Sequence, residues 1–103
     1  MDYQVQIINQ IAEIQQKLKQ EGNEDRYSRN LNKLHHIFDE QGYIYNIPLG
    51  EKYDDSRTDC EVSIAGKESR NMTITQVIKP IIYKKEGNGA KLIQKGIVIV
   101  EAK

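Results

Sequence analysis

The chain has 103 residues, a hydrophobic fraction of 38%, and 15 Lys and Arg that balance 15 Asp and Glu. This length suits one domain with a modest core, which a partner or a second copy of the chain would help to stabilise. Because the formal net charge is zero, no overall field attracts nucleic acid or an anionic membrane, and we expect neither as a partner.

The cysteine content and the N-terminus indicate the compartment. Cys60 is the only cysteine, so one chain can form neither an internal disulfide nor a cysteine-based metal cluster. Residues 1–4 lack the basic and apolar segments of a signal peptide, and no run approaches the roughly 18 apolar residues of a membrane span. We therefore expect a soluble, cytoplasmic protein.

The first part of the chain predicts two antiparallel helices, over residues 2–20 and 25–41. In each, apolar residues recur at the alternating spacing of a narrow helical seam. The first seam consists of Ile7, Ile11, Ile14 and Leu18, and the second of Tyr27, Leu31, Leu34 and Phe38. Between them, residues 21–25 contain Gly and Asn, which end helices. The seams are out of phase, which favours a hairpin over one continuous helix.

Helices of this length need a packed face to be stable. Two hairpins from two chains could pair into a four-helix bundle. We expect this homodimer to use Ile7, Ile11, Ile14, Leu18, Leu31, Leu34 and Phe38. The alternative is that the hairpin packs against the sheet of its own chain.

After Gly42, placed as a helix-ending glycine, the pattern changes to that of strands. Alternating or continuous apolar runs predict strands over residues 43–47, 60–65, 72–77, 78–83 and 91–100. Pro80 must lie at an edge or a kink, and the four branched residues 97–100 predict burial on both faces. The fold class is therefore α+β, with a helical hairpin (1–41) and a small, mainly antiparallel β domain (42–103).

No group of residues predicts an enzyme, a metal or a cofactor. His36 and Glu40 are one helical turn apart and could share a metal, but a solvated helix face explains them better. Asp54, Asp55 and Asp59 have the composition of an ordinary turn rather than of an acid–base pair. Cys60 alternates with charged neighbours on a predicted strand, which favours a packed thiol over a nucleophile.

The aromatic residues after Gly42 allow two interpretations. Tyr43, Ile44, Tyr45 and Ile47 could form a protein-binding surface, because Tyr offers a large contact area with few rotatable bonds. They could equally cover the core of the sheet.

Three segments of the β domain are similar to motifs of one family. Residues 53–60, Tyr-Asp-Asp-Ser-Arg-Thr-Asp-Cys, resemble a Phe-Asp-Pro-x-x-His-Glu-Ala motif at the same distance from the helix-ending glycine. Residues 74–78 resemble Val-x-x-Val-Leu, and residues 97–100 resemble a terminal Met-Val-x-Val. With the order of helices and strands, these segments make nearly the whole chain similar to the C-terminal two-thirds of the GrpE family, the nucleotide exchange factors of DnaK-type chaperones.

The chain also departs from the GrpE pattern. Thr58 stands where the family has His, Asp55 where it has Pro, and Gln94-Lys95-Gly96 where it has Arg-Pro-Ala. The family's long N-terminal stalk helix has no counterpart in this sequence. The resemblance therefore implies a short form of the family.

The resemblance implies a homodimeric co-chaperone that binds the nucleotide-binding domain of a DnaK-type chaperone ATPase and promotes release of ADP. It places the partner-binding positions at Gly42, Tyr53, Asp54, Lys91 and Val100. A second hypothesis, motivated by the change at residues 94–96, is a dimeric structural adaptor that recruits another protein without exchange. A third is a metal-dependent enzyme that uses His36 and Glu40.

Overall fold

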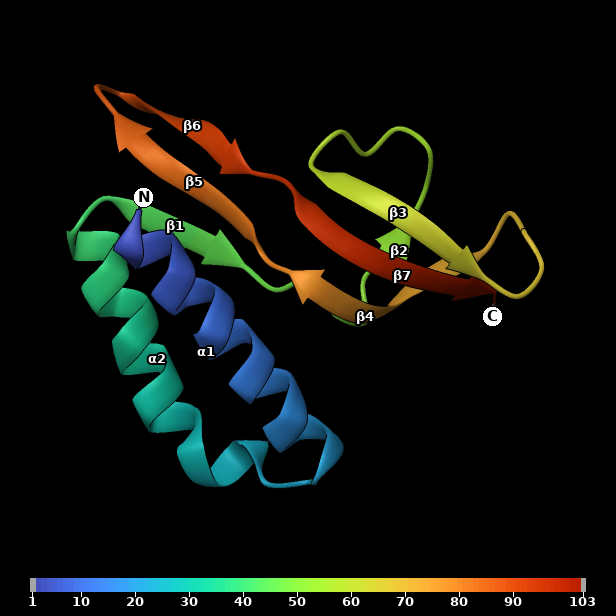
Figure 1. The fold of residues 1–103 in the computed structure, drawn as a ribbon, viewed down its shortest axis with the longest axis horizontal. Coiled ribbons are helices and arrows are strands. Elements are labelled where there is room, and N and C mark those ends of the chain that lie inside the picture. Colours follow the sequence, from blue (N-terminus) through green and yellow to red (C-terminus); the bar gives the residue numbers. More distant parts are fainter. Residues whose placement is uncertain (1, 103) are drawn as a thin grey trace.

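The computed structural model describes residues 2–102 and has the α+β class predicted from the sequence: two helices followed by seven strands in two sheets (Figure 1). The elements are α1 (Tyr3–Gln20), α2 (Glu24–Glu40), β1 (Tyr43–Asn46), β2 (Lys52–Tyr53), β3 (Cys60–Ala65), β4 (Met72–Lys79), β5 (Ile81–Glu86), β6 (Gly89–Gln94) and β7 (Gly96–Ala102). The predicted helix bounds agree with the structure within one residue. Neither helix is both long and apolar enough to cross a bilayer.

Local hydrogen bonds and one glycine set the ends of the hairpin. The Asp2 carboxylate caps α1 by accepting hydrogen bonds from the backbone N–H groups of Gln4 at 3.0 Å and Val5 at 3.3 Å. Gly42 follows α2 with φ +91, a conformation that other residues rarely adopt. The chain passes from this glycine directly into β1.

The strands form two sheets that are joined by one bent, two-stranded ribbon (Figure 1). One strand of this ribbon is β4 followed by β5, and the other is β6 followed by β7. The first sheet has the antiparallel order β1-β5-β6, and the second has the order β2-β4-β7-β3. In the second sheet β3 runs parallel to β7, and the short strand β2 was not predicted from the sequence. The ribbon bends where Pro80 separates β4 from β5 and Lys95 separates β6 from β7, so the predicted kink at Pro80 is confirmed.

The hairpin packs against the first sheet of its own chain. Ile8 and Ile11 of α1 and Phe38 of α2 are buried in one cluster with side chains from β1 and β5, namely Tyr43, Tyr45 and Ile82. Within one chain, the hairpin therefore packs as in the alternative to the four-helix bundle, against the sheet of its own chain. The tyrosines after Gly42 also serve this core.

The second sheet has a separate core on one of its faces. Five buried residues form it, and the segment before and within β2 covers it with Ile47, Leu49 and Tyr53; the five are Met72, Ile74, Val77, Val98 and Val100. Along β7, buried residues alternate with the half-buried Ile97 and Ile99. The prediction of burial on both faces of residues 97–100 is therefore wrong, because the side chains on the second face are only half-buried.

Candidate partner-binding site

The structure separates the five predicted partner-binding positions into two groups. Gly42 and Lys91 lie at the outer end of the first sheet: the Gly42 carbonyl accepts a hydrogen bond from Lys85 N–H at 2.8 Å, and Lys91 pairs with Lys84 of β5. Tyr53, Asp54 and Val100 belong to the second sheet or its loop. Since the molecule extends 40 Å along its longest axis, these groups do not form one compact site.

Val100 contributes to the core rather than to the surface. Its side chain is 0% exposed, and it lies in register with Ile64 of β3 and Ile74 of β4. A partner could reach this side chain only if the second core opened.

Tyr53 and Asp54 line a groove at one end of the second sheet. The groove has a volume of about 550 Å³ and is bounded by residues from β2, β3, β4 and the loops between them. Its apolar lining consists of Tyr53, Ile64 and Met72, and its charged lining of Asp54, Asp55, Glu68 and Arg70. Ile64 is 45% exposed although it lies on the same side of β3 as the core residue Val62.

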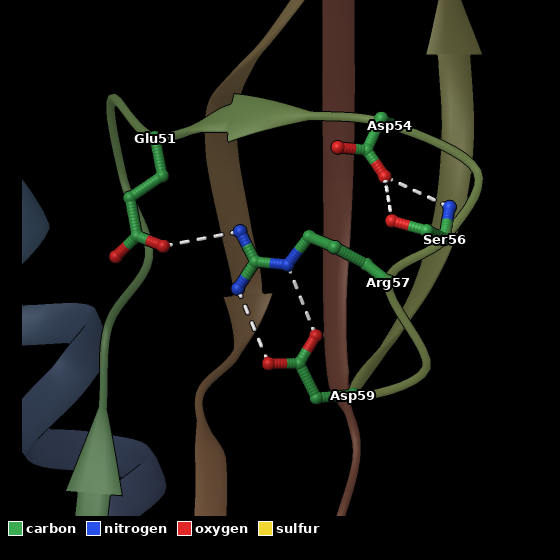
Figure 2. Close-up of polar contacts among 5 residues, drawn as sticks. All are labelled: Glu51, Asp54, Ser56, Arg57 and Asp59. Atoms are coloured by element: carbon green, nitrogen blue, oxygen red, sulfur yellow. Dashed lines mark hydrogen bonds and ion pairs between the residues drawn. The ribbon is translucent and has the colours of Figure 1, made fainter.

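Arg57 holds the loop beside this groove in place (Figure 2). Its Nε and Nη2 donate to the two Asp59 carboxylate oxygens at 3.0 and 3.2 Å, and its Nη1 donates to Glu51 Oε1 at 3.0 Å. The Arg57 side chain is only 18% exposed, so this bidentate pair is better shielded than an ordinary surface pair. The contact with Arg57 lowers the pKa of Asp59.

Asp54 begins the loop with a local turn that is also visible in Figure 2. One of its carboxylate oxygens accepts hydrogen bonds from the Ser56 backbone N–H, at 2.8 Å, and from the Ser56 hydroxyl. These bonds, the hydroxyl first, lower the pKa of Asp54. The carboxylate is therefore ionised at neutral pH and gives this side of the groove negative charge.

Cys60 follows the same loop as the first residue of β3. Burial, together with the nearby Asp59 carboxylate, raises the pKa of its thiol from 9.0 to about 11. The group therefore stays protonated at neutral pH. A protonated thiol agrees with a packed cysteine, whereas a nucleophile or a metal ligand needs the thiolate.

His36 and Glu40 lie on an exposed face of α2, with His36 Nε2 and Glu40 Oε1 3.2 Å apart. Among residues 2–102, no group of three or more His, Cys, Asp or Glu side chains is placed to hold one metal ion. The neighbouring His35 has a different role that the sequence did not indicate. It donates from Nε2 to the Tyr45 carbonyl at 2.9 Å, and its ring lies 4.5 Å from the Tyr45 ring.

The groove includes residues that sequence reasoning missed. Ile64 was expected only as part of the strand over residues 60–65, and Glu68 and Arg70 lie outside every predicted strand. Tyr53 and Ile64 belong to β2 and β3, the two edge strands of one sheet, and the groove reaches both of them. No periodicity in the sequence signals that arrangement.

The predicted dimerisation residues have three different environments in one chain. Ile11 and Phe38 are buried in the first core, at 8% and 6% exposure. Leu18, Leu31 and Leu34 are half-buried. Ile7 and Ile14 are 50% and 53% exposed, and the helices expose three further large side chains, Tyr3, Tyr27 and Ile37.

Comparison with models of known protein families, with curated proteins and with solved structures finds no match to this chain.

Proposed function

We propose that the chain is a GrpE-like co-chaperone that binds the nucleotide-binding domain of a DnaK-type chaperone and promotes release of ADP. The observation that carries this proposal is the order of the elements together with their joint. An antiparallel hairpin ends at a left-handed glycine, Gly42, and continues directly into a β unit. The sequence similarities over residues 53–60, 74–78 and 97–100 add to this layout.

Exchange of this kind needs no bond chemistry. A protein that binds the open, nucleotide-free form of its partner more tightly than the closed form shifts the partner toward release, by no more than the difference in affinity. In this proposal the surface positions Tyr53, Asp54 and Lys91 contact the chaperone, and Val100 supports Tyr53 from the second core. Lys91 supplies a charge there without the planar fork of an arginine.

The proposal includes a homodimer held by the exposed side of the hairpin. Tyr3, Ile7 and Ile14 lie within one narrow stripe of α1, given a rotation of about 100° per residue, and α2 exposes Tyr27 and Ile37. A helix of this length is about 27 Å long, so the two helices of one hairpin offer an extended face to a second copy. Ile11 and Phe38 would stay in the core of each chain.

Stopped-flow release of labelled ADP tests the proposed function. We expect the chain to accelerate release from at least one DnaK-type chaperone, and Lys91→Glu to reduce this acceleration. Lys19→Glu, at an exposed position of α1 about 140° around the helix from Ile14, is the matched control and should leave it unchanged. Unchanged release across several chaperones would exclude exchange activity.

A specific contact favours a second candidate, the adaptor that binds without exchange. Gln94 stands where the family has the second Arg of its Arg-x-x-Arg-Pro-Ala segment, and its amide is occupied within the chain. Gln94 Nε2 donates to Asn9 Oδ1 at 2.7 Å and to the Pro80 carbonyl at 2.9 Å. A pull-down separates the candidates, because the adaptor predicts no chaperone ATPase among the captured proteins.

A further inference from the structure

One edge of the second sheet is open to another strand. The order β2-β4-β7-β3 places β3 at the edge, and its register with β7 runs without a shift from Cys60 to Ala65. Across the part of the chain that the structure describes, β3 has no strand partner other than β7. Cys60 and Val62 are half-buried, whereas Ser63, Ile64 and Ala65 are exposed. The accessible part of the edge is therefore its C-terminal half.

One hydrogen bond shows which backbone groups of β3 point away from β7. The Asp59 carbonyl accepts from Gly96 N–H at 2.9 Å, so Asp59 points toward β7. In a parallel ladder, alternate residues of a strand bond to the same neighbour. Glu61 and Ser63 then also bond to β7, and the N–H and carbonyl groups of Val62 and Ile64 point away from it.

The other sheet edges are shorter, covered or irregular. Strand β2 has two residues, and on β1 the Tyr45 carbonyl already accepts a hydrogen bond from His35 at 2.9 Å. Strand β6 carries Lys91 and pairs with β5 through an irregular register. Strand β3, Cys-Glu-Val-Ser-Ile-Ala, has no Pro, Lys or bulge, the usual devices that prevent pairing at an edge.

The groove at the end of the second sheet reaches this edge at Ile64, and its lining indicates the chemistry of an incoming strand. Ile64 lines the groove and is 45% exposed, so an apolar side chain placed beside it would extend the second core. The charged lining contains three carboxylates, those of Asp54, Asp55 and Glu68, and one guanidinium, that of Arg70. This excess of negative charge favours a basic segment.

We propose that β3 binds an extended, basic segment of a partner protein by strand addition. The segment pairs with the outward backbone groups of Val62 and Ile64, places an apolar side chain against Ile64, and places Lys or Arg near the groove carboxylates. A second copy of β3 is a poorer occupant, because it would bring the same negative groove to the interface. The proposal does not depend on ADP release, although the groove includes Tyr53 and Asp54.

The test uses the full chain, isotope-labelled for NMR, and a capped peptide that alternates Lys and Val. We expect the amides of Val62 and Ile64 to shift and to gain protection from hydrogen exchange, while those of β6 remain unchanged. A peptide that alternates Glu and Val should bind about tenfold more weakly or worse. Equal binding of both peptides, or no protection along β3, would overturn the proposal.

Two groove variants, one control variant and one concentration series complete the test. Ile64→Lys should weaken binding of the Lys-Val peptide by about tenfold or more, whereas Ile93→Lys, at a position 38% exposed on β6, should change it by less than about twofold. Glu68→Lys, in an exposed loop, should also weaken binding and serves if Ile64→Lys does not fold. Unchanged affinity in both groove variants contradicts the proposal. If protection of Val62 and Ile64 rises with protein concentration in the absence of peptide, the occupant of the edge is a second copy of the chain, and the proposal is overturned.

Discussion

The side-chain amide of Gln16, on α1, makes two hydrogen bonds with the backbone of Val77, on β4. Val77 N–H donates to Gln16 Oε1 at 2.9 Å, and Gln16 Nε2 donates to the Val77 carbonyl at 2.6 Å. The register between β4 and β7 shifts on both sides of Val77. The helix side chain thus bonds to a strand where the ladder is irregular, close to the bend between the two sheets.

A second amide contact fastens α1 to the bend itself. Asn9 and Gln94 exchange two side-chain hydrogen bonds, of 2.7 and 3.3 Å, and Gln94 also donates to the Pro80 carbonyl at 2.9 Å. Pro80 and the end of β6 are where the ribbon passes from one sheet to the other. We infer that α1 helps to fix the angle between the sheets.

Removal of the Gln16 amide should destabilise the fold measurably. Gln16→Ala leaves two partly buried backbone groups of Val77 without these partners, which costs about 1–3 kcal/mol. Gln10→Ala, at an exposed position of the same helix, should change the free energy of unfolding by less than about 0.5 kcal/mol. Urea unfolding of both variants checks the difference, and equal stabilities would show that the Gln16 contact contributes nothing.

The bend also requires a residue without a side chain at Gly96. A Cβ atom at this position would lie 2.9 Å from Ile81 Cγ1 and 3.2 Å from Cys60 Sγ. Gly96→Ala should therefore cost about 1–3 kcal/mol through overpacking. Gly89→Ala is the matched control, because its Cβ would meet no atom within 4 Å. Thermal unfolding should separate the two variants, and a Gly96→Ala protein as stable as Gly89→Ala would contradict the close packing.

The helices and most strands could be predicted from the sequence because their signals are local. The four-and-three spacing of seams such as Ile7 to Leu18, and the glycines after each helix, depend only on neighbouring residues. The α+β class followed from the change of periodicity at Gly42.

The arrangement in space could not be predicted in the same way. The seam spacing shows that Ile11 and Phe38 belong to an apolar helix face, but it does not show whether that face packs against a second chain or against the sheet of its own chain. Both packing arrangements therefore remained open at the level of the sequence. The apolar run at residues 97–100 predicted a strand buried on both faces. Whether the second face of a sheet is buried depends on whether other elements of the fold pack against it, which the run itself does not show. The groove joins Tyr53, Ile64 and Glu68 through long-range pairing, of which the sequence carries no local sign.

The thiol of Cys60 should react slowly at neutral pH. Its pKa is raised in the folded chain from 9.0 to about 11, so the native protein keeps the proton over a range in which the unfolded chain loses it. The contribution of this group to stability is therefore fully present below pH 9.0 and is lost as the pH rises through about 11. The rate of alkylation by iodoacetamide, measured against pH, checks this shift. We expect the native rate to rise near the higher value and the rate in urea near the lower one; coinciding profiles would contradict the burial of Cys60.

The proposed homodimer should depend on the exposed stripe of α1. Ile14→Asp places a charge at a side chain that is 53% exposed in one chain, so the fold should persist while the dimer dissociation constant rises about a hundredfold or more. Leu34→Asp should also give monomers, but Leu34 packs against the first core, so loss of folding would accompany it. Asn32→Asp, at an exposed position of α2, adds the same charge about 140° around the helix from Ile37 and should leave the dimer intact. Sedimentation equilibrium measures all three variants. A dimer that survives Ile14→Asp would place the interface elsewhere, and an unsubstituted chain that is monomeric at every concentration would remove the homodimer from the proposal.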